Sequence, residues 1–381
     1  MNRRNFLRLS ALSGSALFAW PCISFATANT DRRFIFIIQR GAADGLNTVI
    51  PYADPNYAKL RGALAIDVSQ AHQLDSMFAL HPALKQTAQL YDDHQALFVH
   101  AVASPYRERS HFDGQNVLET GGKTAYQFQD GWMNRLLTLL PITQNEAIAF
   151  AATIPMALRG NRQVSSYAPT HLPQAPDDLL MRVSQLYAED AQLNPLWTAA
   201  MAANNMAEDA TAKQDPASLG NLVASFLIKP QGPRIAMIET GGWDTHSGQE
   251  GRLARQLSAL DSMISSLKIG LGETWQKTTV VIATEFGRTA AANGTGGTDH
   301  GTASVCMVLG GDVKGGRVLA DWPSLSQNQL YEGRDLKPTT QLNHLFTSII
   351  SESFAIDPNV VAKALWMETS QNKAMTGLIK I

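Results

Sequence analysis

The segment Ile235–His246 reads IAMIETGGWDTH, and the rest of the chain is interpreted around it. Its first four residues are apolar and follow a proline-containing turn, which is typical of a fully buried strand. The glycine pair then ends the strand, because glycine adopts backbone angles that other residues avoid. Glu239, Asp244 and His246 should therefore lie just beyond the carboxyl end of a strand, where α/β sheets bind ligands. This set of oxygens and a nitrogen suits a divalent metal such as zinc. Alternatively, these side chains hydrogen-bond to the backbone of their own loop.

Polar residues accompany other strand-like apolar runs in the same way. The runs are residues 33–39, 97–102, 279–283 and 304–309, and their polar neighbours are Asp44, then Ser110 with His111, then Glu285 with Arg288, then Asp299 with His300. Strand ends in a parallel sheet meet at one edge, so all of these residues can converge there. Several carboxylates can share a desolvated site only if cations neutralise them, which predicts one or two bound metals.

Strand-like and helix-like segments alternate over most of the chain. Helical patterns occupy about 82–91, 251–267 and 338–354, and a further strand-like run covers 147–152. This alternation predicts an α/β fold, a three-layer α/β/α sandwich with a mostly parallel central sheet. The stretch from about residue 175 to 230 has a helical pattern and is interpreted as a helical insertion.

The first 28 residues form a segment of their own. NRRNFLR at residues 2–8 is a twin-arginine pattern, followed by a modestly apolar run and by a small-x-small cleavage site at residues 26–28. We therefore expect export by the twin-arginine translocase to the periplasm or beyond, and a single mature domain at 29–381. This pathway carries folded proteins, which agrees with a metal inserted before export.

The composition excludes several classes of function. The chain has 381 residues, of which 45% are hydrophobic and 17% charged, as in ordinary globular proteins. No apolar run reaches the roughly 18 residues of a membrane span. A formal net charge of -2, without a basic cluster, argues against binding to nucleic acid. Cys306 is the single cysteine beyond the signal and lies in an apolar run, which predicts a buried thiol and no internal disulfide.

Ser110 has two interpretations that the sequence leaves open. With Asp113 three residues later, it resembles a capping box that begins a helix toward Leu118. A serine at a helix N-terminus is also where a nucleophile that attacks phosphate or sulfate gains from the helix dipole and its N–H groups. Ser104, on the same loop, is a second candidate nucleophile.

The order of these residues resembles that of the alkaline phosphatase-like superfamily, which includes sulfatases and cofactor-independent phosphoglycerate mutases. More closely, GAADGLN, ERSHFDGQ, GGWDTH, TEFGRT and GTDHGT behind a twin-arginine signal resemble a secreted bacterial family. It is the domain-of-unknown-function family 1501, placed among sulfatase relatives. The resemblance covers essentially the whole mature chain and implies an alkaline phosphatase-like sandwich.

The resemblance also implies roles for the acids and histidines. Asp44 would join two metal positions, and Asp244 and His300 would hold the first metal with His246 as a third ligand. Glu239 would lie nearer a magnesium-type position. The candidate ligands together are Asp44, Glu239, Asp244, His246, Glu285, Asp299 and His300, and the metal would be zinc, manganese, calcium or magnesium.

Phe286 departs from the superfamily pattern. It follows Glu285 where the superfamily has a histidine, so one nitrogen ligand is removed. A single, oxygen-rich metal site or a degenerate pocket is the expectation that follows.

The implied reaction is attack by Ser110 on a phosphate or sulfate ester, with the metal lowering the pKa of the serine. His111 would act as general acid or would pack beside the helix start. Arg109 and Arg288 would grip the anion bidentately or, alternatively, form ion pairs between loops.

We therefore expect an exported, metal-dependent hydrolase whose substrate is an anionic small-molecule or glycan ester. One alternative is a degenerate, non-catalytic family member that binds an anionic glycan or a protein partner. Another is a metal-free esterase built on Ser110, His300 and an acid, which would leave the remaining carboxylates without neutralisation.

Overall fold

Strand β1 (Arg33–Gln39) lies inside the central sheet and is buried along its whole length. It pairs in parallel with β8 (Ile235–Thr240) on one side and with β9 (Thr278–Ala283) on the other. Phe36 faces one apolar core and Ile37 faces the other. Alternate residues of a strand point to opposite faces, so an unbroken apolar run requires that both faces of the sheet be covered.

The structure, a computed structural model, describes residues 31–140, 147–168, 177–207, 215–367 and 375–380. The predicted twin-arginine signal at 1–28 lies outside the described residues. Within the described part of the chain, no helix has both the length and the apolar character that crossing a membrane requires.

The sheet is parallel apart from one strand, which confirms the predicted mostly parallel arrangement. Its order is β11 (Arg317–Leu319), β5 (Ala96–Ala103), β10 (Ser304–Leu309), β9, β1, β8, β6 (Ala147–Phe150) and β7 (Ser165–Ser166), with β12 (Thr340–Gln341) beside β5. Strand β10 runs antiparallel to both of its neighbours, β9 and β5. Because of this reversal, the start of β10 lies at the edge where the other strands end.

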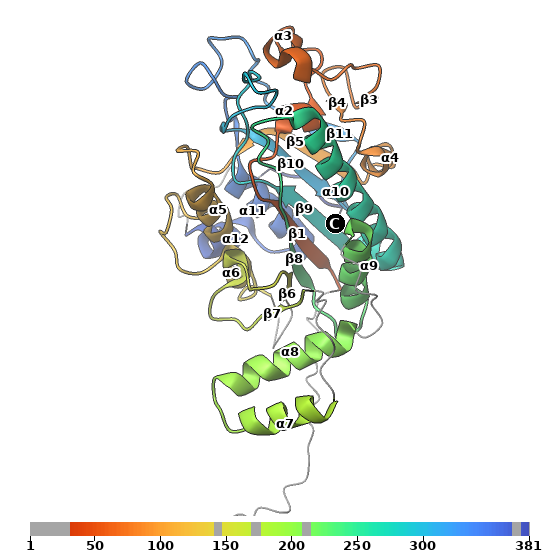
Figure 1. The fold of residues 1–381 in the computed structure, drawn as a ribbon, viewed down its shortest axis with the longest axis vertical. Coiled ribbons are helices and arrows are strands. Elements are labelled where there is room, and N and C mark those ends of the chain that lie inside the picture. The colour runs from red at the N-terminus through yellow and green to blue at the C-terminus, as the bar shows by residue number, and fades with distance from the viewer. Residues whose placement is uncertain (1–30, 141–146, 169–176, 208–214, 368–374, 381) are drawn as a thin grey trace, which may run out of the picture.

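Helices cover both faces of the sheet, which confirms the three-layer sandwich (Figure 1). One layer contains α4 (Lys85–Asp92), α9 (Pro216–Leu227) and α10 (Gln249–Leu271). The other contains α5 (His111–Thr120), α6 (Trp132–Leu136), α11 (Leu342–Phe354) and α12 (Pro358–Trp366). The two apolar cores lie between these layers and the sheet.

The stretch interpreted as a helical insertion holds α7 (Asp177–Tyr187), α8 (Leu193–Ala207) and α9. Helix α9 packs closely along α10, because a Cβ at Gly220 would lie 2.3 Å from the carbonyl oxygen of Met263. Helices α7 and α8 lie beyond the β7 edge of the sheet (Figure 1). Thus α9 belongs to a covering layer, whereas α7 and α8 lie outside it.

Short elements fill the connection between β1 and α4. They are α2 (Gly45–Thr48), β2 (Val49–Ile50), α3 (Tyr57–Arg61), the 3-10 helix η1 (Gly62–Leu64), β3 (His72–Gln73) and β4 (Ala79–Leu80), of which the strands form a small sheet in the order β2, β4, β3. Two more 3-10 helices, η2 (Met156–Leu158) and η3 (Gly272–Lys277), complete the described elements.

Candidate metal centre

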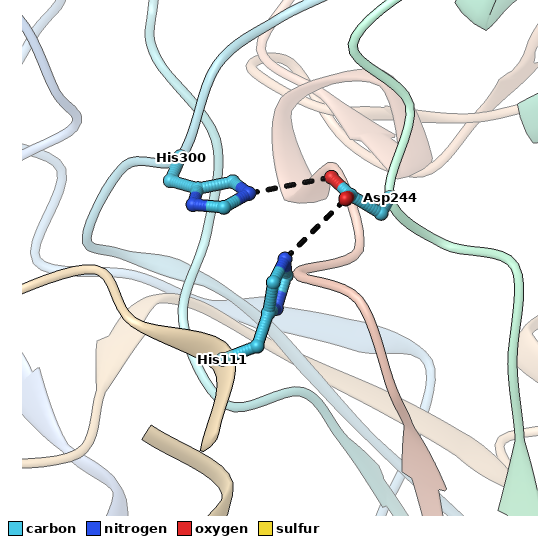
Figure 2. A group of neighbouring side chains, drawn as sticks. All are labelled: His111, Asp244 and His300. Carbon is cyan, nitrogen blue, oxygen red and sulfur yellow. Dashed lines mark hydrogen bonds and ion pairs between the residues drawn. The ribbon is translucent and has the colours of Figure 1, made fainter. Parts of the chain in front are cut away.

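His111 is the first residue of α5, and its ring points toward Asp244 (Figure 2). Its Nδ1 lies 2.8 Å from Oε1 of Glu285, and its Nε2 lies 3.5 Å from Oδ2 of Asp244. An ionised carboxylate only accepts hydrogen bonds, so Nδ1 carries a hydrogen and, in the neutral ring, Nε2 carries a lone pair. Among the described residues this Nε2 is buried without a hydrogen-bond partner.

His300 lies beside His111, with ring centroids 4.3 Å apart, and its ring also points toward the carboxylate of Asp244 (Figure 2). Its Nδ1 lies 3.0 Å from the carbonyl oxygen of Arg109, and its Nε2 lies 3.3 Å from Oδ1 of Asp244. A carbonyl oxygen also only accepts, so Nδ1 donates here too and Nε2 again carries the lone pair.

His246 repeats this arrangement. Its Nδ1 lies 3.0 Å from Oδ1 of Asp299, and its Nε2 lies 3.1 Å from Oδ1 of Asp244 and 2.9 Å from Nε2 of His300. The Nε2 atoms of all three histidines thus face the carboxylate of Asp244. If His246 and His300 are both neutral, their Nε2 lone pairs point at each other and at the carboxylate of Asp244, which is repulsive. A proton or a cation between these atoms would remove the repulsion.

The donor atoms fit a divalent metal ion. One atom each of His111, Asp244 and His300 lies within 4.8 Å of the other two. In a tetrahedral zinc site with bonds of about 2.0–2.1 Å, the ligand atoms lie roughly 3.3 Å apart. The distances of 3.3 Å from His300 to Asp244 and 3.1 Å from His246 to Asp244 are close to that spacing. Imidazole nitrogens and a carboxylate oxygen are donors typical of zinc, and His246, which lies outside that group of three, would be a further donor.

Each histidine has an acceptor that fixes its orientation. Histidines that bind metals typically donate their other ring hydrogen to a carboxylate or a carbonyl, which sets the tautomer. Glu285 does this for His111, Asp299 for His246 and the Arg109 carbonyl for His300. Glu285 and Asp299 were predicted as ligands themselves; the structure places them behind the histidines that face Asp244.

Burial and neighbouring charges shift the pKa values of these groups. Burial opposes ionisation of Glu285, but hydrogen bonds from His111 and Gln115 outweigh it and lower the pKa of this carboxyl. The hydrogen bond that His111 donates to Glu285 also raises the pKa of His111. Burial, together with the charge of His111, lowers the pKa of His300. A metal would therefore compete with a proton at Nε2 of His111.

The pKa of Asp244 is lowered as well. Burial opposes ionisation of this carboxyl, and the hydrogen bond and charge of Arg288 outweigh that effect. Asp244 is consequently an anion, and its side chain is 44% exposed. An exposed carboxylate with three imidazoles around it is an accessible centre.

Close backbone packing brings the two halves of the site together. The N–H of Gly301 donates to the carbonyl of Gly287 at 2.8 Å, and Arg288 and His300 form an isolated antiparallel bridge. A Cβ at Gly287 would lie 1.8 Å from the carbonyl oxygen of Ala303. No side chain fits there, so glycine is required for the loop after β9 to meet the loop before β10.

Arg288 has a different role from the predicted anion grip. Its guanidinium is buried and donates to the carbonyls of Gly41, Ala42, Trp243 and Thr298, and to Oδ1 of Asp244 at 2.6 Å. These bonds tie the loops after β1, β8 and β9 to one another. In this structure Arg288 therefore organises the loops, and its predicted roles in binding the anion and in catalysis stay predictions.

Arg109 is likewise engaged through its side chain. Its Nε donates to Oδ2 of Asp335 at 2.9 Å, and its Nη2 donates to Oε2 of Glu332 at 2.5 Å. The alternative of an ion pair between loops therefore describes Arg109 in this structure, and its carbonyl group serves His300.

Ser110 occupies the N-cap position of α5, but its hydroxyl makes no capping hydrogen bond. The predicted capping box is therefore not formed. Ser104 is buried, and its hydroxyl accepts a hydrogen bond from the N–H of Tyr106 at 3.3 Å. Phe286 is buried, with its ring 5.2 Å from that of His111 and 5.3 Å from that of His300, so it supports two of the histidines.

Asp44 does not join the group around Asp244. It caps α2, and both of its oxygens are held by Arg61, at 2.6 Å and 3.0 Å. The side chain of Gln249 donates to the same carboxylate. These contacts fill the carboxylate, so the predicted role of Asp44 between two metals is corrected to that of a helix cap in a buried ion pair.

Glu239 also lies apart from the three histidines. Its Oε1 accepts a hydrogen bond from Nε of Arg40 at 2.9 Å, and Arg40 also pairs with Glu119 at 2.8 Å. Arg40 thus neutralises Glu239 in this structure, and the predicted position of Glu239 near a magnesium-type ion stays a prediction. Sequence reasoning missed both arginines, Arg40 and Arg61, because an arginine that neutralises an acid from a distant segment has no motif.

Comparison with known proteins identifies a family for this chain but finds no similar curated protein. The family profile described as "Protein of unknown function (DUF1501)" matches residues 31–365. No curated protein matches the chain.

Several solved structures are similar to the chain at low identity. A protein in the alkaline phosphatase superfamily from Vibrio parahaemolyticus is 11% identical, with a TM-score of 0.46, and the match covers 99% of this chain and 82% of that one. The lipoteichoic acid synthase LtaP from Listeria monocytogenes is 9% identical, with a TM-score of 0.40 and coverage of 97% and 79%. The C-terminal periplasmic domain of EcEptC from Escherichia coli, in complex with Zn, is 9% identical, with a TM-score of 0.38 and coverage of 74% and 76%. Similarities this remote assign no activity.

Proposed function

The chain belongs to the DUF1501 family of proteins of unknown function, and we propose that it is an exported, metal-dependent hydrolase of phosphate or sulfate esters. The mature protein would be a single domain, residues 29–381, exported by the twin-arginine translocase to the periplasm or beyond. Zinc is the metal that the donor set favours over manganese, calcium and magnesium, because three of the four donors are imidazole nitrogens.

One observation carries this proposal: the Nε2 atoms of His111, His246 and His300 all face the carboxylate of Asp244, and each ring has its Nδ1 hydrogen held by an oxygen acceptor. Three independent acceptors set the same tautomer three times. Core histidines that only pack have no need of this agreement. It supports a centre that presents lone pairs to a cation.

The proposed roles follow from these positions. Asp244, His111, His246 and His300 would hold the metal, and Glu285, Asp299 and the Arg109 carbonyl would orient the rings. When bound, the metal would act as a Lewis acid that lowers the pKa of a nearby hydroxyl group and stabilises negative charge.

Ser110 is the proposed nucleophile, since it precedes His111 and its hydroxyl makes no capping bond. The first N–H groups of α5 have no partner within the helix, so they would bind the oxygens of the phosphate or sulfate group. They take over the anion-binding role once expected of Arg109 and Arg288. The substrate class is an anionic small molecule or a glycan ester.

A second function is favoured by one specific observation. The guanidinium groups of Arg109 and Arg288 are both occupied by the protein's own acids and carbonyls, so neither of these two arginines is available to stabilise charge in a transition state. A non-catalytic member that holds a metal and binds an anionic glycan or protein partner fits this observation. The metal-free esterase is less favoured, because the Nε2 atoms of His111 and His300, which would have to accept the serine proton, face the carboxylate of Asp244 rather than the hydroxyl of Ser110.

Metal content tests the proposal directly. The folded mature protein is purified without a histidine tag and its metal is measured by mass spectrometry, beside Asp244→Ala, His300→Ala and the control His72→Ala. His72 forms an exposed ion pair with Asp92 outside the site. About one equivalent of zinc in wild type and in His72→Ala, lost from both site variants, is the expected result.

Activity then separates the two functions. A panel of phosphate and sulfate esters is assayed with wild type, Ser110→Ala and Ser104→Ala, all loaded with metal. Turnover lost in Ser110→Ala alone supports the hydrolase with Ser110 as nucleophile. Bound metal without turnover of any ester would transfer the proposal to the binding protein. A wild type that folds without metal, even after incubation with zinc, would contradict both.

A further inference from the structure

Within the described chain, Nδ1 of His300 has one hydrogen-bond partner, the carbonyl oxygen of Arg109. The position of this carbonyl therefore determines the orientation of the His300 ring. In a neutral imidazole one nitrogen donates and the other accepts. If the carbonyl turned away, either nitrogen of His300 could carry the hydrogen, and Nε2 would no longer be committed to Asp244, which lies 3.3 Å away. The peptide group after Arg109 therefore controls one of the candidate metal ligands.

Arg109 holds an unusual backbone conformation. Its φ is +61°, in the left-handed region that residues with a side chain rarely adopt. This region is unfavourable for an L-residue other than glycine, asparagine or aspartate, because Cβ comes too close to the following carbonyl oxygen. Strain of this kind persists only where the surrounding structure holds it, and it concentrates at functional sites.

The side chain of Arg109 shows what holds the conformation. Two nitrogens of its guanidinium approach one oxygen, Oδ2 of Asp335, at 2.9 Å from Nε and 2.8 Å from Nη2. Asp335 is 0% exposed, whereas Glu332, the other partner of Arg109, is 56% exposed. A buried carboxylate is costly unless it is paired, so the contact with Asp335 is the firm one and the contact with Glu332 is screened by water.

Asp335 is itself anchored on the site side of the molecule. Its backbone forms bridges with Thr289 and Tyr331, and the carbonyl of Arg334 accepts a hydrogen bond from the N–H of Ala290 at 3.0 Å. The side chain of Arg334 donates to the carbonyl of His300. The segment 331–335 thus contacts both His300 and Arg109, the residue whose carbonyl orients the His300 ring.

We infer that Asp335 and Arg109 are a positioning pair: their buried ion pair holds Arg109 in the left-handed conformation, so that its carbonyl fixes the hydrogen of His300 on Nδ1 and aims Nε2 at the metal centre. The inference deepens the proposed function and rests on His300 as a ligand. Neither side chain touches the metal or the substrate, and both act through His300.

Two double variants test the role of the backbone conformation. Arg109→Asn with Asp335→Asn and Arg109→Val with Asp335→Asn both remove the ion pair and its buried charge. They differ at position 109, where asparagine tolerates the left-handed region and a β-branched valine does not. We expect the asparagine variant to bind zinc within about tenfold of wild type and the valine variant about 10–100-fold more weakly, the loss typical of residues that orient a ligand.

The tautomer gives a readout that needs neither metal nor activity. In metal-free, histidine-labelled protein, 15N spectra at about pH 8 should show His300 with its hydrogen on Nδ1 in wild type and in the asparagine variant, and a mixture of tautomers in the valine variant. Glu332→Gln is the matched control and should leave both the tautomer and zinc affinity unchanged within about twofold. Urea unfolding checks that each variant is folded.

The outcomes distinguish this inference from the proposed function. Equal zinc affinity and equal tautomers in the two double variants would overturn the positioning role, whatever the wild type binds. A wild type without zinc but with a fixed Nδ1 tautomer, lost only in the valine variant, would keep the positioning pair and refute the metal centre. If Asp335→Asn prevents folding, the single variants Arg109→Asn and Arg109→Val are compared in the same way.

Discussion

Two aspartates, Asp44 and Asp244, follow adjacent strands through glycine-containing loops, yet their surroundings are opposite. Asp44 is 1% exposed and is neutralised by the buried guanidinium of Arg61. Asp244 is 44% exposed, and besides Arg288 its neighbours are three histidine side chains. Position at the end of a strand therefore does not distinguish a structural acid from a candidate ligand.

The difference lies in what each carboxylate lacks. Arg61, the backbone N–H groups of α2 and Gln249 satisfy Asp44 completely, so it has no acceptor capacity left for a cation. The imidazoles around Asp244 have their hydrogens bonded elsewhere, so they bring lone pairs rather than charge. The first aspartate is a structural acid, and the second is the candidate ligand.

The largest effect is expected where the buried pair is broken. Arg61→Met leaves the carboxylate of Asp44 buried without its counter-charge, which typically costs about 3–5 kcal/mol. Urea unfolding of the mature protein should show that loss in the free energy of unfolding. Asp244→Ala is the matched variant at the other loop, and it removes the carboxylate partner of the buried Arg288. We expect it to lower stability by less than Arg61→Met does, because Asp244 is partly exposed and backbone carbonyls still accept hydrogen bonds from Arg288.

A double variant controls for the change in side-chain volume. Arg61→Met with Asp44→Asn removes both charges but keeps an oxygen that can cap α2, so it should recover part of the stability. If Arg61→Met and Asp244→Ala cost the same, the contrast between the two loops is mistaken.

The positions of the long strands could be predicted from the sequence, because strands buried on both faces are continuous apolar runs. Strands β1 and β9 are unbroken apolar runs, and the structure has them at Arg33–Gln39 and Thr278–Ala283, as expected. The direction of β10 could not be predicted, because an antiparallel strand and a parallel one buried on both faces have the same apolar pattern. Strands of two or three residues, such as β7 and β11, carry no readable period at all.

The candidate site was predictable as a set of residues and not as a set of roles. Asp244, His246 and His300 come from short motifs and lie together, and their binding of a metal stays a prediction. His111 was expected to act in catalysis or to pack, yet it faces Asp244 as the other histidines do. Whether an acid meets a guanidinium or an imidazole is decided by segments far apart in the chain, and periodicity does not report such contacts.

A smaller effect is expected from pH at the contact of His111 with Glu285. In metal-free protein the hydrogen bond to Glu285 raises the pKa of His111 above 6.5. Burial opposes ionisation of Glu285, but its hydrogen bonds prevail and lower its pKa below 4.5. The stability from His111 is present below pH 6.5 and is lost as pH rises through its raised pKa. The stability from Glu285 is present above pH 4.5 and is lost as pH falls through its lowered pKa. The contact between His111 and Glu285 therefore stabilises the protein most between pH 4.5 and pH 6.5.

Glu285→Gln makes this visible. With chelator present, the free energy of unfolding is measured for wild type and variant at about pH 5.5 and about pH 8.5. We expect the variant to lose more stability, relative to wild type, at the lower pH. An equal loss of stability at the two pH values would mean that no charge forms on His111. The comparison of Asp44 with Asp244 would then have to omit a charged His111.

The smallest effect concerns two exposed histidine–aspartate pairs of equal length. His246 lies 3.0 Å from Asp299, and His72 lies 3.0 Å from Asp92. Both pairs are solvated, so His246→Ala and His72→Ala should each change the stability of metal-free protein by less than about 1 kcal/mol. Only His246 also brings a second nitrogen within 3.1 Å of Asp244, so only His246→Ala should weaken zinc binding in a calorimetric titration. Equal zinc affinities in the two variants would exclude His246 from the centre and leave His111, Asp244 and His300 as its ligands. The loop of Asp244 thus differs from that of Asp44 in that several imidazole nitrogens converge on its carboxylate. The length of an individual ion pair does not show this difference.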